Sequence, residues 1–296
     1  MPERGATAYS RIMGDGAGPT TAAQDEAPAK APLPVTFLGH STVAFTVDAA
    51  RILVDPMLRS GVGVGMLRWM APAVAPEVAR ANDVVLISHL HNDHLDVPSL
   101  WRLGRRHPIV VPRGAGRMMR VRGFSNVSEI GLGESFEVAG STVTAVFAEH
   151  SGYRPPLGPK AQALGFVIEG PTRRVYYAGD TDIFPAMADL AKPSLDLALI
   201  PVWGWGPNLG PGHLDPVEAA NALKLLDPDW AIPVHWGGLW LRVLRGEKRR
   251  LLSDPPREFA DAARALGLGD RVVLIQPGES HTFSQDSRPH DRETPG

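Results

Sequence analysis

Ser88-His89-Leu90-His91-Asn92-Asp93-His94 directly follows the apolar run Val84–Ile87 and places three imidazoles and a carboxylate within six residues. A continuous apolar run is typical of a strand buried on both faces. Neutral imidazole and carboxylate are the ligands that zinc and iron accept when thiolate is absent, and this chain contains no Cys. A tight loop lets His89 and His91 point one way and Asp93 and His94 another, so one loop can serve two adjacent metals. The alternative is a solvated His-rich turn, but a mobile polar loop would not need so many imidazoles after a buried strand.

Three further predicted strands end at a residue that can bind a metal. His150 follows Thr142–Phe147, Asp180 follows the strand that ends at Tyr177, and His235 follows Trp230–Val234. In open α/β sheets, ligand sites gather beyond the carboxyl ends of the strands. A lone His at a strand end is more often solvent-facing, and an Asp after Gly also suits a turn. Four such strand ends together favour a metal site.

The chain resembles the metallo-β-lactamase-fold hydrolases, whose signature is H-x-H-x-D-H, then a His, then an Asp after a strand, and then a last His. The resemblance covers nearly all of residues 35–283. It implies an α/β fold of the αββα type, with two mixed β-sheets face to face and helices outside. It also implies one metal on His89, His91 and His150, a second metal on Asp93, His94 and His235, and Asp180 as the bridge between them.

Further motifs are similar to one branch of these hydrolases, which holds the N-acyl-phosphatidylethanolamine phospholipase D and ascorbate-6-phosphate lactonase relatives. The segments that carry this similarity are Phe37–Thr42, Ile52–Pro56, Ile200–Trp203, His213–Ala219 and Pro233–Gly237, and the last three look closest to the phospholipase-like members. The absence of Cys sets the chain apart from lactamases that place Cys in the second metal site. Antibiotic hydrolysis is therefore not expected.

The resemblance implies a dinuclear metal-dependent hydrolase, in which a metal-bridging hydroxide attacks a phosphodiester or an ester or lactone. Two divalent ions are expected as cofactors, zinc first, with manganese or iron as alternatives. Asp93 and Asp180 are expected to act in catalysis at the metals, while His213 is either a general acid or only a residue of the helix entry. Two other functions stay open. One is an iron-containing redox enzyme on the same fold, and the other is a non-catalytic metal-binding protein.

Other residues near the predicted centre have both functional and structural interpretations. His40, Trp203, Trp205 and His213 are predicted to contact the substrate. For His40 the alternative is a structural role in the tight connection between two strands, and for the tryptophans it is ordinary packing. Asp55 either orients a ligand histidine or is a plain turn carboxylate.

The composition of the 296-residue chain, with 44% apolar and 21% charged residues, is that of a folded, soluble protein. The formal net charge of −2 argues against a dedicated nucleic-acid-binding protein. We expect one domain over residues 35–283, a loosely packed or disordered arm over 1–34, and a disordered tail over 284–296. Without an apolar signal region or a run of 18 apolar residues, a cytoplasmic location is expected.

The expected partner is a small-molecule or lipid-like ester or phosphodiester, and the oligomeric state stays open. We expect two basic stretches of the chain to form solvated helix faces. The alternative is that they attract an anionic substrate or make a peripheral membrane contact. These stretches comprise Arg102, Arg105, Arg106, Arg113, Arg117, Arg120 and Arg122, and Arg242, Arg245, Lys248, Arg249 and Arg250.

Short apolar runs predict strands, and amphipathic stretches with helix-start residues predict helices. The predicted strands are Val35–Leu38, Val43–Val47, Arg51–Val54, Val84–Ile87, Ser141–Phe147, Leu164–Glu169, Arg174–Tyr177, Leu195–Ile200, Trp230–Val234 and Arg271–Ile275. The predicted helices are Val97–Leu103, Gly114–Arg122, Pro185–Ala191, Pro216–Leu226 and Pro256–Leu266.

Overall fold

Alternate residues of the central strands enter two different apolar layers. In the strand β6 (Val84–Leu86), Val84 and Leu86 belong to one buried cluster, while Val85 and the following Ile87 belong to another. Side chains of successive strand residues point to opposite faces, so a strand with an apolar layer on each side needs an unbroken apolar run. The prediction of a strand buried on both faces is confirmed. The computed structural model describes residues 29–59, 61–62, 66–68, 81–204, 209–241 and 250–284.

The first sheet contains β6 and is mixed. Its strand order in the described residues is β16-β1-β2-β3-β6-β7-β8, antiparallel from β16 to β3 and parallel from β3 to β8. The other strands of this sheet are β1 (Leu33–Gly39), β2 (Thr42–Val47), β3 (Ala50–Val54), β7 (Ile109–Pro112), β8 (Val127–Ile130) and β16 (Ser280–Phe283).

The second sheet is also mixed, with the described strand order β14-β13-β12-β11-β10-β9. Its strands are antiparallel from β9 to β12 and parallel from β12 to β14. They are β9 (Ser135–Val138), β10 (Ser141–Phe147), β11 (Leu164–Glu169), β12 (Arg174–Tyr177), β13 (Leu197–Pro201) and β14 (Trp230–Val234). A small third sheet joins β4 (Gly61–Val62), β5 (Met66–Arg68) and β15 (Leu239–Leu241).

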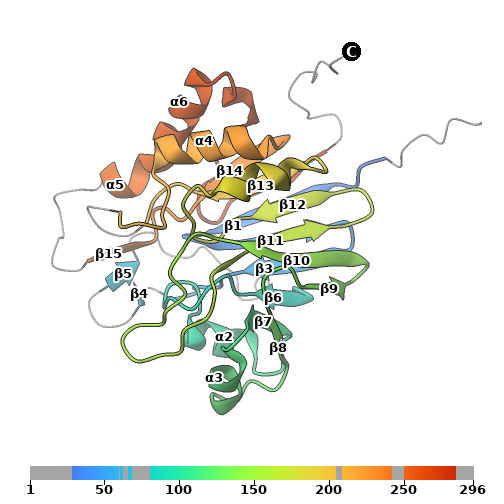
Figure 1. The fold of residues 1–296 in the computed structure, drawn as a ribbon, viewed down its shortest axis with the longest axis vertical. Helices are drawn as coiled ribbons and strands as arrows, with labels where there is room; N and C mark the ends of the chain where they lie inside the picture. The colour runs from blue at the N-terminus through green and yellow to red at the C-terminus, as the bar shows by residue number, and fades with distance from the viewer. Residues whose placement is uncertain are drawn as a thin grey trace, which may run out of the picture.

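The two large sheets stack with helices on their outer sides, which confirms the predicted αββα sandwich (Figure 1). The helices α2 (Val97–Leu103) and α3 (Gly116–Val121) lie at one end of the molecule, against the first sheet. The opposite end carries α4 (Pro216–Leu226), α5 (Arg250–Ser253), α6 (Pro255–Ala265) and the 3₁₀ segments η1 (Pro185–Ala191) and η3 (Gly269–Arg271). No helix among the described residues has the length and apolar character to cross a bilayer.

Two predicted elements are corrected by the structure. The segment Pro185–Ala191 is a 3₁₀ helix, and the strand predicted at Arg271–Ile275 is reduced to a single bridge between Val272 and Ala231. The amide of Val273 donates to the carbonyl of Ala231 at 2.9 Å. Two residues further along β14, Pro233 has no N–H to continue this ladder.

The two sheets approach each other closely where β12 ends. A Cβ on Gly179 would lie 2.8 Å from Cβ of Ser88 and 3.0 Å from the carbonyl oxygen of Leu164, and Gly179 has a φ of +63°. The polar loop after β6 therefore lies directly against the loop after β12. Only a residue without a side chain allows this approach.

Gly179→Ala is therefore expected to destabilise the fold more than Gly133→Ala. Both glycines have positive φ, but a Cβ on Gly133 would meet nothing within 4 Å. The two variants share the backbone strain, so their difference isolates the steric clash, which we expect to be about 1–3 kcal/mol. Denaturant unfolding of both variants measures this difference. Equal free energies of unfolding would contradict the close approach.

Candidate metal centre

Seven side chains that can bind metals converge from both sheets at one edge of the sandwich. The loop after β6 carries His89, His91, Asp93 and His94, and the second sheet contributes His150 after β10, Asp180 after β12 and His235 after β14. The ligand atoms of His89, His91 and His150 form one compact group, and those of Asp93, His94 and His235 form a second one together with His40. In each group these atoms lie within 4.8 Å of one another.

Hydrogen bonds fix which ring nitrogen of each histidine faces the centre. The Nδ1 atoms of His150 and His235 lie 2.7 Å and 2.6 Å from the carbonyl oxygens of Gly212 and Trp203. A carbonyl oxygen can only accept, so each Nδ1 donates its proton and each Nε2 faces Asp180 at the centre, at 4.0 Å for His150 and 3.1 Å for His235. Outer hydrogen bonds of this kind are what orient metal-binding histidines.

The inner polar atoms lack the hydrogen bonds that buried groups require. The Nε2 atoms of His89, His94 and His235 and Oδ1 of Asp180 are buried and have no hydrogen-bond partner in the described part of the chain. Leaving such atoms unsatisfied costs about 1–3 kcal/mol each. A shared divalent cation satisfies lone pairs of this kind, so the donor set fits a metal.

Asp180 lies at the middle of the cluster. Its Oδ2 is 3.1 Å from Nε2 of His235 and 3.2 Å from Nε2 of His94. The Nε2 atoms of His213, His89 and His150 follow at 3.7, 3.8 and 4.0 Å. One carboxylate oxygen thus faces histidines of both groups, which is the position that a bridge between two metals requires.

Asp55 supports the cluster from behind. It follows β3, is fully buried, and its Oδ2 accepts from Nδ1 of His94 at 2.6 Å and from the hydroxyls of Ser88 and Tyr177 at 2.5 and 2.6 Å. Its Oδ1 accepts from the backbone amide of Ser88 at 2.7 Å. Of the two interpretations of Asp55, the structure favours the residue that orients a ligand histidine. The sequence did not predict the hydrogen bond of Tyr177 to Asp55, because a Tyr in a buried strand is expected to be a core residue.

Ser88 extends this support to a second histidine. Its hydroxyl donates to Asp55, so its oxygen can accept from Nδ1 of His89, 3.0 Å away. This contact leaves Nε2 of His89 directed at the centre. Ser88, the residue before the H-x-H-x-D-H motif, therefore supports the ring of His89.

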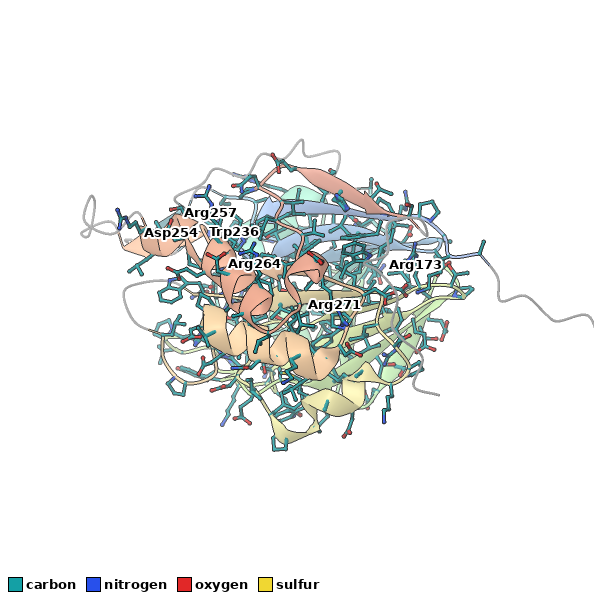
Figure 2. All side chains as sticks on the ribbon, turned by 90° about the horizontal axis from the view of Figure 1, so that it is seen from above. Arg173, Trp236, Asp254, Arg257, Arg264 and Arg271 are labelled. Atoms are coloured by element: carbon teal, nitrogen blue, oxygen red, sulfur yellow. The ribbon has the colours of Figure 1, made fainter. Side chains whose placement is uncertain are left out.

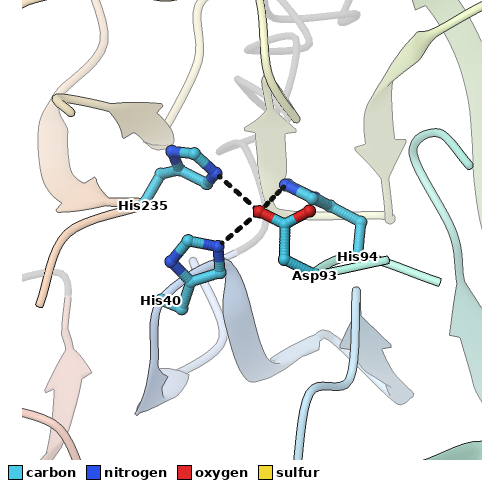
Figure 3. Close-up of side chains that lie close together, drawn as sticks. All are labelled: His40, Asp93, His94 and His235. Carbon is cyan, nitrogen blue, oxygen red and sulfur yellow. Dashed lines mark hydrogen bonds and ion pairs between the residues drawn. The ribbon is translucent and has the colours of Figure 1, made fainter. Parts of the chain in front are cut away.

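His40 lies beside Asp93, with its ring directed at the carboxylate, as Figure 3 shows. Its side chain is fully buried, and its Nε2 donates to Oδ2 of Asp93 at 3.0 Å. Nε2 of His235 and Nε2 of His94 lie 3.7 and 3.8 Å from the same oxygen. A buried ring in this place argues against the predicted substrate contact of His40 and favours its structural alternative.

Burial and the nearby carboxylates shift the pKa values of the histidines in opposite directions. Burial lowers the pKa of His150 to about 4 and, together with the nearby His235, lowers that of His40 to about 4. For His94 burial also acts against the charged form, but Asp180, Asp55 and Asp93 outweigh it and hold the pKa well above its ordinary value. The surrounding histidines likewise overcome burial and hold the pKa of Asp180 well below its ordinary value. The centre therefore keeps negative carboxylates with which a cation can pair.

His213 lies at the mouth of the centre, next to His150. The two rings meet edge to face with centroids 4.7 Å apart, and Nδ1 of His213 is 3.1 Å from the carbonyl oxygen of Gly210. Its side chain keeps 17% of its surface exposed, unlike the buried rings of His89 and His94. The adjacent helix α4 begins with the predicted capping box between Asp215 and Glu218.

The two predicted tryptophans differ in what the structure describes. Trp203 is partly buried against the core between the sheets, and its carbonyl holds His235, which favours packing over substrate contact. Trp205 lies outside the described residues.

Sequence reasoning also missed Arg154. Its Nη1 donates to the carbonyl oxygens of Leu90 and Leu95 at 2.8 and 3.0 Å, one inside the metal loop and one just beyond it. A cleft of about 800 Å³ opens beside His150, and Gly212, Glu149, Arg113 and Lys160 are also among its lining residues. It offers a bound molecule a place next to His150.

Asp55→Asn is expected to weaken metal binding by about 10–100-fold, because the amide cannot accept as the carboxylate does from His94, Ser88 and Tyr177 together. Asp83→Asn is the matched control, since Asp83 pairs with Arg51 at the surface, at 2.6 Å. Titration of the metal-free proteins with zinc, monitored by calorimetry, measures the change in zinc affinity. Unaltered zinc affinity in Asp55→Asn would remove the supporting role of Asp55.

Comparison with known proteins agrees with this arrangement. Residues 50–236 match the family model described as the Beta-lactamase superfamily domain. A UPF0173 metal-dependent hydrolase of Methanopyrus kandleri is 30% identical over 261 residues, which cover 83% of this chain and 98% of that protein.

Two further similarities concern an enzyme and a solved structure. An N-acyl-phosphatidylethanolamine-hydrolyzing phospholipase D of Caenorhabditis elegans is 30% identical over 226 residues, covering 68% of this chain and 63% of that protein. The metallo hydrolase Igni18 of Ignicoccus hospitalis has the same fold, with a TM-score of 0.65, 23% identity, and coverage of 86% of this chain and 99% of that one.

Proposed function

The chain belongs to the metallo-β-lactamase superfamily as a metal-dependent hydrolase, and on that premise we propose that it cleaves an ester or phosphodiester bond at a dinuclear site. In this site His89, His91 and His150 would hold one ion, Asp93, His94 and His235 would hold the other, and Asp180 would contribute to both positions. The observation that carries this proposal is the set of buried Nε2 atoms around Oδ2 of Asp180.

Zinc is the metal we propose for both positions. The candidate donor atoms are imidazole nitrogens and carboxylate oxygens, a set that zinc accepts in tetrahedral sites with an open position. Bound ions of this kind supply Lewis acidity, which activates water near neutral pH and stabilises charge on the substrate. Manganese and iron accept the same donors and are the alternatives that metal analysis distinguishes.

The protein residues prepare the site before a substrate arrives. Asp55, Gly212 and Trp203 fix the rings of His94, His150 and His235 through the hydrogen bonds described above. Ligands held in advance do not have to reorganise during the reaction, and this is where electrostatic catalysis gains most. The partly exposed His213 places its Nε2 3.7 Å from Oδ2 of Asp180, and we propose that this ring transfers a proton.

An ester or phosphodiester is the proposed substrate class, for two reasons. Both bonds are cleaved by attack of activated water, with negative charge developing on an oxygen that a cation stabilises. In addition, one relative is named for the hydrolysis of a phospholipid diester. A purely metal-binding role has less support, because a site held only for storage needs no partly exposed His213 beside the ligands.

We expect metal-free protein to take up two zinc ions per chain, with a lower melting temperature before zinc is added. Asp180→Ala is expected to lose turnover of bis(p-nitrophenyl) phosphate and p-nitrophenyl esters, because it removes the carboxylate that faces histidines of both groups. Asp182→Ala, in the same loop, is the matched control. Elemental analysis after titration and initial rates measure both effects. Wild-type rates in Asp180→Ala at saturating zinc, or uptake of no metal by the wild type, would contradict the proposal.

His213→Ala is expected to keep both metal ions and lose about 10²–10⁴-fold in kcat, because it removes the proposed general acid. His281→Ala on β16 serves as a control for the loss of an imidazole elsewhere. A change confined to KM would indicate that His213 binds substrate without proton transfer. Normal kinetics with a lower melting temperature would leave His213 a structural residue of the helix entry.

A further inference from the structure

An arginine-rich segment of the chain without acidic residues lies at the α2–α3 end of the molecule. Residues 97–128 contain seven Arg and no Asp or Glu, although the whole chain carries a net charge of −2. The segment includes α2, β7, α3 and the first half of β8. Positive charge is thus concentrated within this segment.

Several of these arginines have no acidic neighbour that would neutralise them. Arg113 pairs with Glu134, and Arg120 lies 3.3 Å from Glu129. Among the residues that the structure describes, Arg105, Arg106, Arg117 and Arg122 form no ion pair with a carboxylate. Arg105 instead lies over the ring of Trp101, with its guanidinium carbon 5.7 Å from the centroid.

Exposed apolar side chains lie on the same surface. Leu157 is 93% exposed and Val121 is 78% exposed, while Trp101 is 45% exposed. Leu157 and Val121 line a groove of about 690 Å³ between α3 and residues 154–159, together with Arg117 and Arg122. A large apolar side chain that is almost fully exposed between arginines gains nothing from contact with water.

We propose that this basic apolar surface, made by Trp101, Arg105, Arg117, Val121, Arg122 and Leu157, docks on an anionic phospholipid bilayer. Arginines attract the anionic headgroups, while apolar side chains enter the interface between headgroups and acyl chains. A nucleic acid complements only the positive charge of this surface, because Leu157 and Val121 have no aromatic ring on which a base can stack. The indole N–H of Trp101 donates to the carbonyl of Arg122 at 3.2 Å, which ties this ring to α3 instead of leaving it free to stack.

The surface is directly connected to the candidate metal centre. Arg154, three residues before Leu157, holds the metal loop through the carbonyl oxygens of Leu90 and Leu95. Lys160, three residues after Leu157, lines the cleft that contains His150. A bilayer bound at Leu157 therefore lies beside the entrance to the cleft. This inference does not rest on which bond the enzyme cleaves.

The test is co-sedimentation of the full chain with vesicles. Vesicles of phosphatidylcholine mixed with phosphatidylglycerol are compared with vesicles of phosphatidylcholine alone, at low and at high salt. We expect binding to the anionic vesicles only, weakened by salt because the charges are exposed. At about fivefold per basic residue, Arg117→Ala/Arg122→Ala should reduce the partition about 25-fold. Leu157→Asp should reduce it about tenfold or more, because it removes an apolar contact and adds a negative charge.

The matched control is Arg257→Ala/Arg264→Ala on α6, which removes two arginines at the opposite end of the molecule (Figures 1 and 2). It should bind like the wild type, and circular dichroism should show every variant folded. Equal binding to neutral and anionic vesicles would overturn the proposal, and so would an unchanged partition of both surface variants. Tighter binding to a DNA duplex, lost in the same arginine variants, would also overturn it. Hydrolysis assays on the unbound protein keep this outcome separate from the proposed function.

Discussion

The rest of the centre depends on the hydrogen bonds that the carboxylate of Asp55 accepts. A single buried group accepts from a ligand histidine, from the backbone and side chain of the residue before the metal loop, and from a tyrosine of the opposite sheet. Because a buried carboxylate needs all of these donors, it fixes them relative to one another. The loop after β6 and the strand β12 therefore share one anchor, although they are far apart in the sequence.

Unusual backbone conformations mark the same region. Asp55, His40 and His235 all have positive φ, at 41°, 57° and 62°. Such conformations cost free energy in residues other than glycine and persist only where the surroundings hold them. The tight packing supplies that support, since Gly238 leaves just enough space for the ring of His40. Local strain is here part of how the side chains are aimed at a common point.

Sequence patterns predicted the sandwich and the convergence of seven side chains, because both follow from local signals. Strands such as Ser141–Phe147 and helices such as Pro216–Leu226 have the predicted bounds. The strand Ile109–Pro112 was missed because two prolines flank a very short apolar run, and Ser280–Phe283 because it is mostly polar and pairs at an edge. The shared contacts of Asp55 and Tyr177, the burial of His40 and the clamp from Arg154 depend on packing between distant segments. No periodicity or spacing reports such contacts.

The division of the candidate ligands between the two sheets has a mechanical consequence. The loop after β6 belongs to one sheet, while His150, Asp180 and His235 follow strands of the other. The apolar layer between the sheets, with Val54, Phe166 and Tyr177 among its residues, acts as a spacer that sets the width of the centre. Protein interiors are packed as densely as organic crystals and have low compressibility. The volume of the side chains in this layer therefore sets the distance between the ligands of the two sheets. A substitution deep in the sandwich can therefore retune the distances between donor atoms without touching any of them.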